Sequence, residues 1–129
     1  MLIGSAAAAA GVSTKAVRFY EEQGLLPAPE RAANGYRIYA PDTVGRLDFI
    51  RRGRAAGLSV SQLRDILAVR DPGNAPCPHV RDALADQLAA LDAQIAELTA
   101  LRNGMAEAHA AVAAGDPATC DAGLICSYL

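Results

Sequence analysis

Hydrophobic residues in the first 70 positions recur at the three- and four-residue steps of amphipathic helices. The pattern predicts helices over residues 3–10, 14–23, 42–56 and 60–70. Ser13 or Thr14 and Ser59 stand where an N-cap is needed, because their hydroxyl groups accept hydrogen bonds from free backbone N–H groups. Glycines follow the first three helices, as is common at helix C-termini: Gly11, Gly24 and Gly57.

The first two predicted helices are short and joined by a tight glycine-containing turn, which is typical of a helix-turn-helix. We expect three apolar side chains of this segment to face the core: Val12, Val17 and Leu25. We expect three others to face outward: Lys15, Arg18 and Tyr20.

Residues 30–40 carry the signature of a β-hairpin. Asn34-Gly35 favours a tight turn, because both residue types tolerate positive φ. The residues that follow alternate in character, as a short strand would: Tyr36, Arg37, Ile38 and Tyr39. The segment is therefore predicted to be a β-wing beside the helix-turn-helix, although Tyr39 could equally pack inside the wing.

A proline- and glycine-containing linker at residues 71–78 separates the head, residues 1–70, from a long helix at residues 79–114. Apolar side chains follow this helix at steps of three and four, close to a heptad seam: Val80, Leu84, Leu88, Leu91, Ile95, Leu98, Leu101 and Met105. A helix with one apolar stripe needs a partner, and a second copy is the simplest one. The alternative is a helix folded back on its own head. Residues 115–129 form a loop and tail, which Leu124 and Ile125 are expected to anchor against the long helix.

Charge is distributed unevenly between the two halves of the chain. Residues 1–70 contain ten Lys and Arg and six Asp and Glu, whereas residues 71–129 contain two Arg and eight Asp and Glu. A basic head can follow a phosphate backbone, and an acidic tail cannot. The overall pattern therefore predicts a mainly α protein with a DNA-binding head.

Cysteine content points to thiol chemistry rather than structural disulfides. The three cysteines are an odd number, and we expect a cytoplasmic protein, since no signal peptide or stretch of ~20 apolar residues is present. Thiols in a reducing compartment suit metal binding or redox chemistry. No paired carboxylates, phosphate-binding loop or nucleophile–base arrangement stands out, so we do not expect an enzyme or a membrane-bound protein.

Several motifs resemble the MerR family of transcriptional regulators. They are Val17-Arg18-Phe19-Tyr20-Glu21, Gly24-Leu25-Leu26-Pro27, Asn34-Gly35-Tyr36-Arg37-Ile38-Tyr39 and Gly57-Leu58-Ser59. The resemblance implies a winged helix-turn-helix head and a long helix that forms an antiparallel coiled-coil homodimer. It also implies binding to palindromic promoters and activation by distortion of the DNA for RNA polymerase, so that specificity depends partly on DNA deformation.

The tail selects a branch of this family by analogy. Metal-sensing members carry two cysteines around a short loop after the long helix, as Cys120 and Cys126 do here. In the sensors of zinc, cadmium, lead or mercury a further cysteine opens the long helix, and Cys77 stands at that position. Copper and gold sensors usually have serine there, so Cys77 favours a divalent soft metal ion.

The long helix separates these thiols. About 35 residues at 1.5 Å each give ~50 Å, so one chain cannot gather all three around one ion. An antiparallel dimer can, which supports two equivalent sites, each with Cys120 and Cys126 of one subunit and Cys77 of the other. Three thiolates suit soft ions, whereas zinc prefers a fourth ligand. His79 is the nearest candidate, ahead of Asp121 and His109.

Five residues of the head are the predicted DNA contacts: Lys15, Arg18, Tyr20, Tyr36 and Arg37. Arginine and lysine supply phosphate contacts, and a helix in the groove presents side chains to base edges. Arg51, Arg52 and Arg54 are candidates for further backbone contacts. A thiol redox sensor or a copper(I) sensor on the same scaffold is the alternative function.

Overall fold

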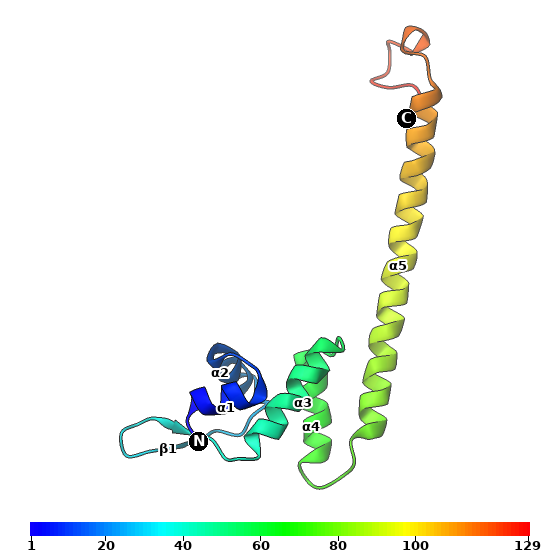
Figure 1. Ribbon diagram of the computed structural model, residues 1–129. Coiled ribbons are helices and arrows are strands. Elements are labelled where there is room, and N and C mark those ends of the chain that lie inside the picture. The colour runs from blue at the N-terminus through cyan, green and yellow to red at the C-terminus, as the bar shows by residue number, and fades with distance from the viewer. The chain divides into compact units, whose positions relative to one another are not determined.

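Five α-helices, a short 3-10 helix and a two-stranded hairpin make up the chain in the computed structural model, which describes residues 1–129 (Figure 1). The elements are α1 (Ile3–Ala10), α2 (Thr14–Glu22), β1 (Glu30–Arg31), β2 (Arg37–Ile38), α3 (Thr43–Ala55), α4 (Val60–Arg70), α5 (Cys77–Ala114) and η1 (Pro117–Thr119). They form two units, residues 1–87 and 88–129, which divide within α5. The predicted domain boundary at 71–78 stays a prediction.

The helix ends lie within two residues of their predicted positions, because capping groups determine them. The Ser13 hydroxyl accepts a hydrogen bond from the Ala16 N–H at 3.0 Å. Ser59 and Gln62 form a reciprocal capping box at the start of α4. At the other end of a helix, Gly11 adopts a left-handed φ of 71° that ends α1.

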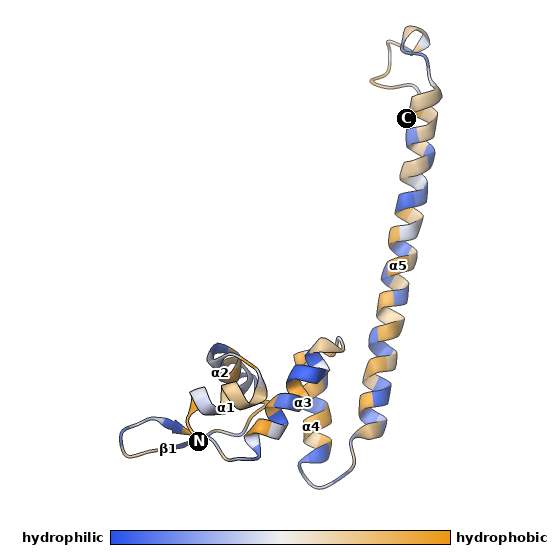
Figure 2. Ribbon diagram, in the orientation of Figure 1, coloured by the Kyte–Doolittle hydropathy of each residue, from blue (hydrophilic) through white to orange (hydrophobic).

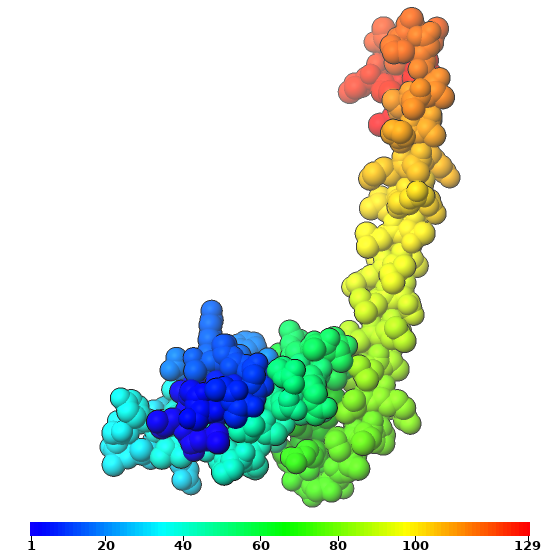
Figure 3. Space-filling model, in the orientation of Figure 1, coloured from blue at the N-terminus to red at the C-terminus, as the bar shows by residue number.

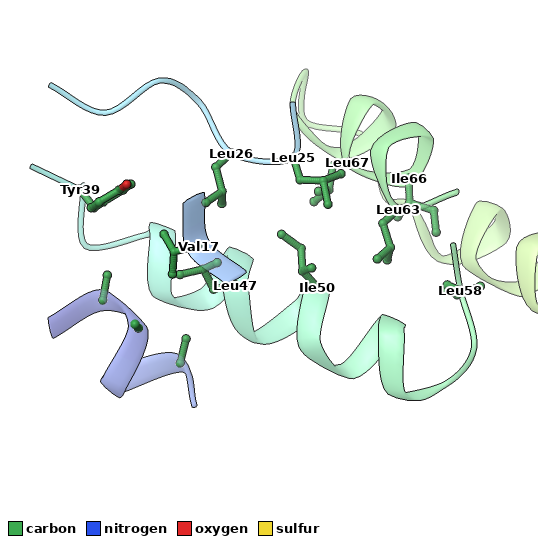
Figure 4. Close-up of a cluster of buried hydrophobic side chains, with 13 residues drawn as sticks. Val17, Leu25, Leu26, Tyr39, Leu47, Ile50, Leu58, Leu63, Ile66 and Leu67 are labelled. Carbon is green, nitrogen blue, oxygen red and sulfur yellow. The ribbon is translucent and has the colours of Figure 1, made fainter. Parts of the chain in front are cut away.

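The head is built around one cluster of buried side chains from α1 to α4 (Figure 4). Its largest fully buried members are Val17, Leu25, Leu47, Ile50, Leu58, Leu63 and Ile66. Figure 4 shows Leu47 and Ile50 pointing from α3 into the cluster. Each buried leucine or isoleucine contributes roughly 1.5–3 kcal/mol. Helix α3 contacts both α1 and α4 and is therefore the central element of the head.

Arg46 on α3 connects three segments of the head. Its Nε donates to the Leu25 carbonyl oxygen at 2.6 Å. Its two terminal nitrogens donate to the two carboxylate oxygens of Asp71 at 2.6 and 3.1 Å. These hydrogen bonds hold the pKa of Asp71 below its usual range. The bidentate pair joins α3 to the end of α4 with fixed geometry.

The predicted wing is present, but its turn differs from the expected one. Strands β1 and β2 pair antiparallel, with Arg31 opposite Arg37. No residue other than glycine has a positive φ, so Asn34 does not, whereas Gly35 has a φ of 84°. Hydrogen bonds close a three-residue loop between Ala32 and Tyr36, with the left-handed glycine last. The Asn34 side chain instead accepts a hydrogen bond from the Tyr36 N–H at 3.1 Å.

The second unit contains most of α5 and the C-terminal loop, and its helix carries an uncovered apolar seam. The seam residues are between 53% and 66% exposed: Leu88, Leu91, Ile95, Leu98, Leu101 and Met105. Orange and blue segments alternate along this part of α5 in Figure 2, and its side chains stand uncovered on the face shown in Figure 3. Val80, expected in the seam, instead packs on the core of the head. No helix has the length and hydropathy that crossing a membrane requires.

Replacing Gly53 by alanine is expected to destabilise the head. A Cβ at this position would lie 2.5 Å from Cδ2 of Leu63, so the fully buried Leu63 side chain or the helices themselves must shift. Overpacking of this kind costs about 1–3 kcal/mol, which exceeds the ~1 kcal/mol gained from the better helix propensity of alanine. The free energy of unfolding in urea, at fixed protein concentration, measures the effect. Gly45→Ala on the same helix is the matched control, since nothing lies within 4 Å of its Cβ; it should stabilise the protein. Equal effects of the two substitutions would contradict the prediction.

The Arg46–Asp71 pair is expected to make stability depend on pH in the acid range. Because folding lowers the pKa of Asp71, the pair stabilises the protein above the unfolded pKa of about 3.9, and the contribution is lost as pH falls through the folded value. Asp71→Asn should therefore be less stable than the parent at pH 7 and indistinguishable from it at the acid end. Urea unfolding across this pH range measures the difference. Asp65→Asn, exposed on α4 and unpaired, is the control; a pH-independent difference for Asp71→Asn would contradict the assignment.

Candidate nucleic-acid interface and candidate metal site

Helix α2 presents its basic side chains to solvent and its apolar face to the core. Lys15 and Arg18 are exposed as predicted, and Val17 is fully buried. Tyr20 is a correction: it is half-buried and packs against the core. The reason is helical spacing, since Tyr20 lies three residues after Val17 and so shares its face. The exposed aromatic side chain on α2 is Phe19, at 45%, which the sequence analysis did not single out.

One hollow brings three of the predicted DNA contacts together. It has a volume of about 520 Å³ and is lined by the start of α1 (Leu2, Ile3, Gly4, Ser5), by Arg18, and by the wing residues Gly35, Tyr36 and Arg37. Tyr36 is 64% exposed at the tip of the wing. Lys15 and Tyr20 do not line this hollow. The arrangement combines two arginines with an exposed aromatic ring, a combination suited to a phosphate backbone and to base or sugar surfaces.

Glu21, which the sequence analysis did not identify, joins α2 to the wing. Its Oε2 accepts a hydrogen bond from the Tyr39 hydroxyl at 2.9 Å and lies 3.3 Å from Nε of Arg37. Tyr39 is buried, as the alternative interpretation of the wing allowed. Burial, and then the hydrogen bond to Glu21, raise the pKa of Tyr39 to about 12. The hydroxyl therefore remains a proton donor at any physiological pH.

The arginines at the end of α3 have partners within the head. Arg51 and Arg52 both donate to Asp48, at 2.7 and 3.0 Å. The hydrogen bond from Arg51, more than that from Arg52, lowers the pKa of the Asp48 carboxyl. Arg54 donates to the Leu58 carbonyl oxygen at 3.0 Å. These ion pairs reduce the positive charge that this segment offers to DNA.

Cys120 and Cys126 lie together in the C-terminal loop. They line one hollow of about 330 Å³ with Val112, Gly115, Pro117 and Tyr128. The N–H and the hydroxyl of Ser127 both donate to Sγ of Cys120, at 3.5 and 3.3 Å. These two hydrogen bonds, with a smaller contribution from Cys126, lower the pKa of the Cys120 thiol. Hydrogen bonds to sulfur favour the thiolate, which is the form that binds metals.

Tyr128, rather than the predicted aliphatic pair, anchors this loop to the end of α5. Its hydroxyl donates to the Asp116 carbonyl oxygen at 3.0 Å and lies 2.8 Å from the Thr119 hydroxyl. Its ring packs against Gly115 so closely that a Cβ there would collide with it. Leu124 is 57% exposed and Ile125 is fully exposed, so the expectation that they anchor the loop was wrong. Hydrophobic patterning did not predict this anchor, because the Tyr128 hydroxyl holds the loop through hydrogen bonds.

The remaining candidate ligands do not join this pair in a group of three. Cys77 and His79 are exposed in the first turn of α5. This turn belongs to the first unit. His109 is exposed on α5, and the Asp121 carboxylate accepts a hydrogen bond from the Gly123 N–H at 2.8 Å within its own turn. Within one chain, no three Cys, His, Asp or Glu side chains gather as a metal site would require. The donor set of the loop is thus two thiols.

Comparison with family models covers nearly the whole head and much of α5. Residues 2–39 match the model described as "MerR family regulatory protein", and residues 44–108 match the one described as "MerR, DNA binding". Both descriptions concern transcriptional regulators and not enzymes.

Curated relatives and a solved structure agree with this match. The chain is 41% identical over 102 residues to "HTH-type transcriptional regulator HmrR" of Rhizobium leguminosarum bv. viciae, covering 79% of this chain and 78% of the relative. It is 34% identical over 120 residues to the "Probable heavy metal-dependent transcriptional regulator" of Haemophilus influenzae, covering 93% and 94%. The lead(II) complex of the transcription regulator PbrR691 from Ralstonia metallidurans CH34 superposes with a TM-score of 0.74 at 32% identity, covering 93% and 94%. The chain therefore belongs to the MerR family of DNA-binding transcriptional regulators.

Proposed function

We propose that this protein is a metal-responsive transcriptional regulator that binds promoter DNA as a homodimer in the cytoplasm. The observation that carries the proposal is that Cys120 and Cys126 line the same hollow in the loop after α5. Two thiols, one with a lowered pKa, fit a soft thiophilic ion better than a hard one. The names of the relatives, a heavy metal-dependent regulator and a regulator in complex with lead(II), support the same class of effector.

The dimer is supported by the apolar seam of α5. Six large side chains between Leu88 and Met105 stay more than half exposed, although they are spaced to face one partner helix. Leaving this surface in water is unfavourable, and a second copy of the same helix covers it with self-complementary packing. The regular spacing of the seam therefore supports a coiled coil with a second helix.

The length of α5 supports a site shared between subunits. The helix runs without a break from Cys77 to Ala114, and its 38 residues span roughly 57 Å at 1.5 Å each. In an antiparallel pair, the start of one helix lies beside the end of its partner. Cys77 of one subunit then becomes the third thiolate for Cys120 and Cys126 of the other. When bound there, a soft ion supplies a rigid cross-link between the subunits.

The nature of the ion depends on the number of ligands. Three thiolates suit mercury, cadmium or lead, whereas zinc needs a fourth ligand, and His79, two residues after Cys77, is the candidate. On the DNA side, Lys15, Arg18, Tyr20, Tyr36 and Arg37 remain the proposed contacts, with Tyr20 the weakest because of its packing. Bound metal would favour the distorted promoter that RNA polymerase uses.

A second candidate is a sensor that uses only the loop thiols, either by oxidation or by binding copper(I). The observation that favours it is that Cys120 and Cys126 line the same hollow, where Cys126 contributes to the lowered pKa of the Cys120 thiol. A sensor of this kind does not require Cys77. The role of Cys77 therefore separates the two proposals.

Each chain is expected to bind one cadmium ion, detected by the thiolate-to-metal charge-transfer band, in the presence of excess non-thiol reductant. Cys77→Ser, Cys120→Ser and Cys126→Ser should each lower the affinity by more than the roughly 10–100-fold that changes beyond the direct ligands cost. His109→Ala is the control and should bind normally.

An equimolar mixture of Cys77→Ser chains with Cys120→Ser/Cys126→Ser chains should regain binding, because each heterodimer contains one complete site. Binding that survives loss of all three cysteines contradicts the metal site, and undiminished binding by Cys77→Ser favours the loop-only sensor.

Placing a charge in the seam is expected to dissociate the dimer. Leu98→Asp puts an unpaired carboxylate in the proposed interface twice, and burying such a group costs several kcal/mol, so the dimer dissociation constant should rise at least about 100-fold. Sedimentation equilibrium at micromolar concentration measures it. Ala100→Asp introduces the same charge on the opposite side of α5 and should remain dimeric. A wild-type monomer, or equal effects of the two variants, would remove the basis for a shared site.

A further inference from the structure

Two side chains of the wing converge on one carboxylate oxygen of α2. Oε2 of Glu21 accepts the Tyr39 hydroxyl at 2.9 Å and lies 3.3 Å from Nε of Arg37. Tyr39 is 2% exposed and the Glu21 side chain 19% exposed, so water screens these contacts little. This is the polar contact that joins α2 to the strand that follows the wing turn.

The chemistry of the contact is strong and directional. A buried tyrosine hydroxyl needs a hydrogen-bond partner, and a charged acceptor roughly doubles the strength of the bond. Tyr39 gives the carboxylate one hydrogen bond, and Arg37 balances its charge. Removing the carboxylate would leave a buried hydroxyl without an acceptor and would leave the Arg37 side chain without its inner partner.

The orientation of Arg37 depends on this contact. Its Nε is buried and makes no aligned hydrogen bond, so its position is set by attraction to Glu21 and not by another partner. Its terminal nitrogens form no hydrogen bond or ion pair in the chain, and its side chain is 32% exposed. The guanidinium also lines the hollow that contains Arg18 and Tyr36. Its inner edge is therefore held by Glu21, and its outer edge is free for an anion.

We propose that Glu21 is a positioning residue for DNA binding, which fixes the wing and the guanidinium of Arg37 relative to α2 so that Arg18 and Arg37 meet the same stretch of phosphate backbone. The inference rests on the proposed DNA contact of Arg37. It is independent of the metal site.

Simple electrostatics predicts the opposite effect from a positioning role. Removing any carboxylate near DNA should tighten binding, because one repulsive charge is lost. If Glu21 positions Arg37, its removal should instead weaken binding despite the gain in net positive charge. The sign of the change therefore separates the two roles.

The probe is a duplex of about 30 base pairs that the wild-type protein selects from a randomised DNA library, titrated at several salt concentrations. Glu21→Ala should weaken binding about tenfold and reduce the slope of log K against log salt by about two, because each of the two subunits of the proposed dimer loses one phosphate contact. Glu22→Ala is the matched control: Glu22 neighbours Glu21 on α2 but is exposed and unpaired, and its removal should leave binding unchanged or tighter. Arg37→Ala tests the contact itself and should show the same loss of slope.

A double-mutant cycle and a charge-neutral variant separate positioning from a general loss of structure. Tyr39→Phe removes only the hydroxyl, and combining it with Glu21→Ala should cost no more than Glu21→Ala alone, because both act through one contact. Glu21→Gln keeps an acceptor for Tyr39 without the charge and should fall between wild type and Glu21→Ala. If Glu21→Ala does not remain folded by circular dichroism, Glu21→Gln and Tyr39→Phe carry the test with the same salt-slope readout.

Two results would overturn the inference in different ways. If Arg37→Ala binds like wild type, the proposed DNA contact is wrong and Glu21 has nothing to position. If Arg37→Ala loses affinity while Glu21→Ala and Glu21→Gln bind like Glu22→Ala, the contact is correct and the role of Glu21 is wrong. Neither outcome bears on metal binding, which the cysteine variants test separately.

Discussion

The physical constraint on which this structure depends is the exposed apolar seam of α5. Helix α5 runs for 38 residues without one buried side chain. Isolated helices in water gain little from propensity alone, and most helical stability in proteins comes from packing an apolar face. A helix of this length with a regular apolar seam therefore needs a packing partner. This need for a partner supports the proposed dimer, on which the shared thiolate site depends.

Local signals in the sequence were sufficient to predict most of the head. Ser59 with Gln62, and Gly11 with its left-handed φ, act through groups within a few residues of themselves. Because such capping is local, the composition of a short window determines it, and the helix ends were predicted to within two residues. The three- and four-residue spacing of the buried positions on α3 and α4 is also local and was predictable for the same reason. Family resemblance then gave the arrangement of these elements.

The residues that were assigned wrongly are those whose role depends on distant partners or on a finer reading of the helix. Tyr20 was expected to face outward, although its spacing from Val17 places it on the inner face. Leu124 and Ile125 were expected to hold the loop because they are apolar, whereas the hydroxyl of Tyr128 does so. Glu21 meets Tyr39 across 18 positions of sequence. No local pattern indicates such a contact.

The position of Cys77 bears on how an ion could act on DNA. Cys77 is the first residue of α5, and the following turns of this helix contact the head. Val80 and Ala83 pack on the core of the head, and the Gln62 side chain accepts a hydrogen bond from Gln87 at 2.8 Å. Protein interiors are close-packed and resist small displacements, so a force on Cys77 is transmitted to α4 and the core rather than absorbed. A ligand shifts a conformational equilibrium only by its difference in affinity for the two states. In the proposed dimer, a cross-link from Cys77 to the partner's loop would be formed well in one arrangement of the heads and poorly in another, and that difference is the free energy available to distort the promoter.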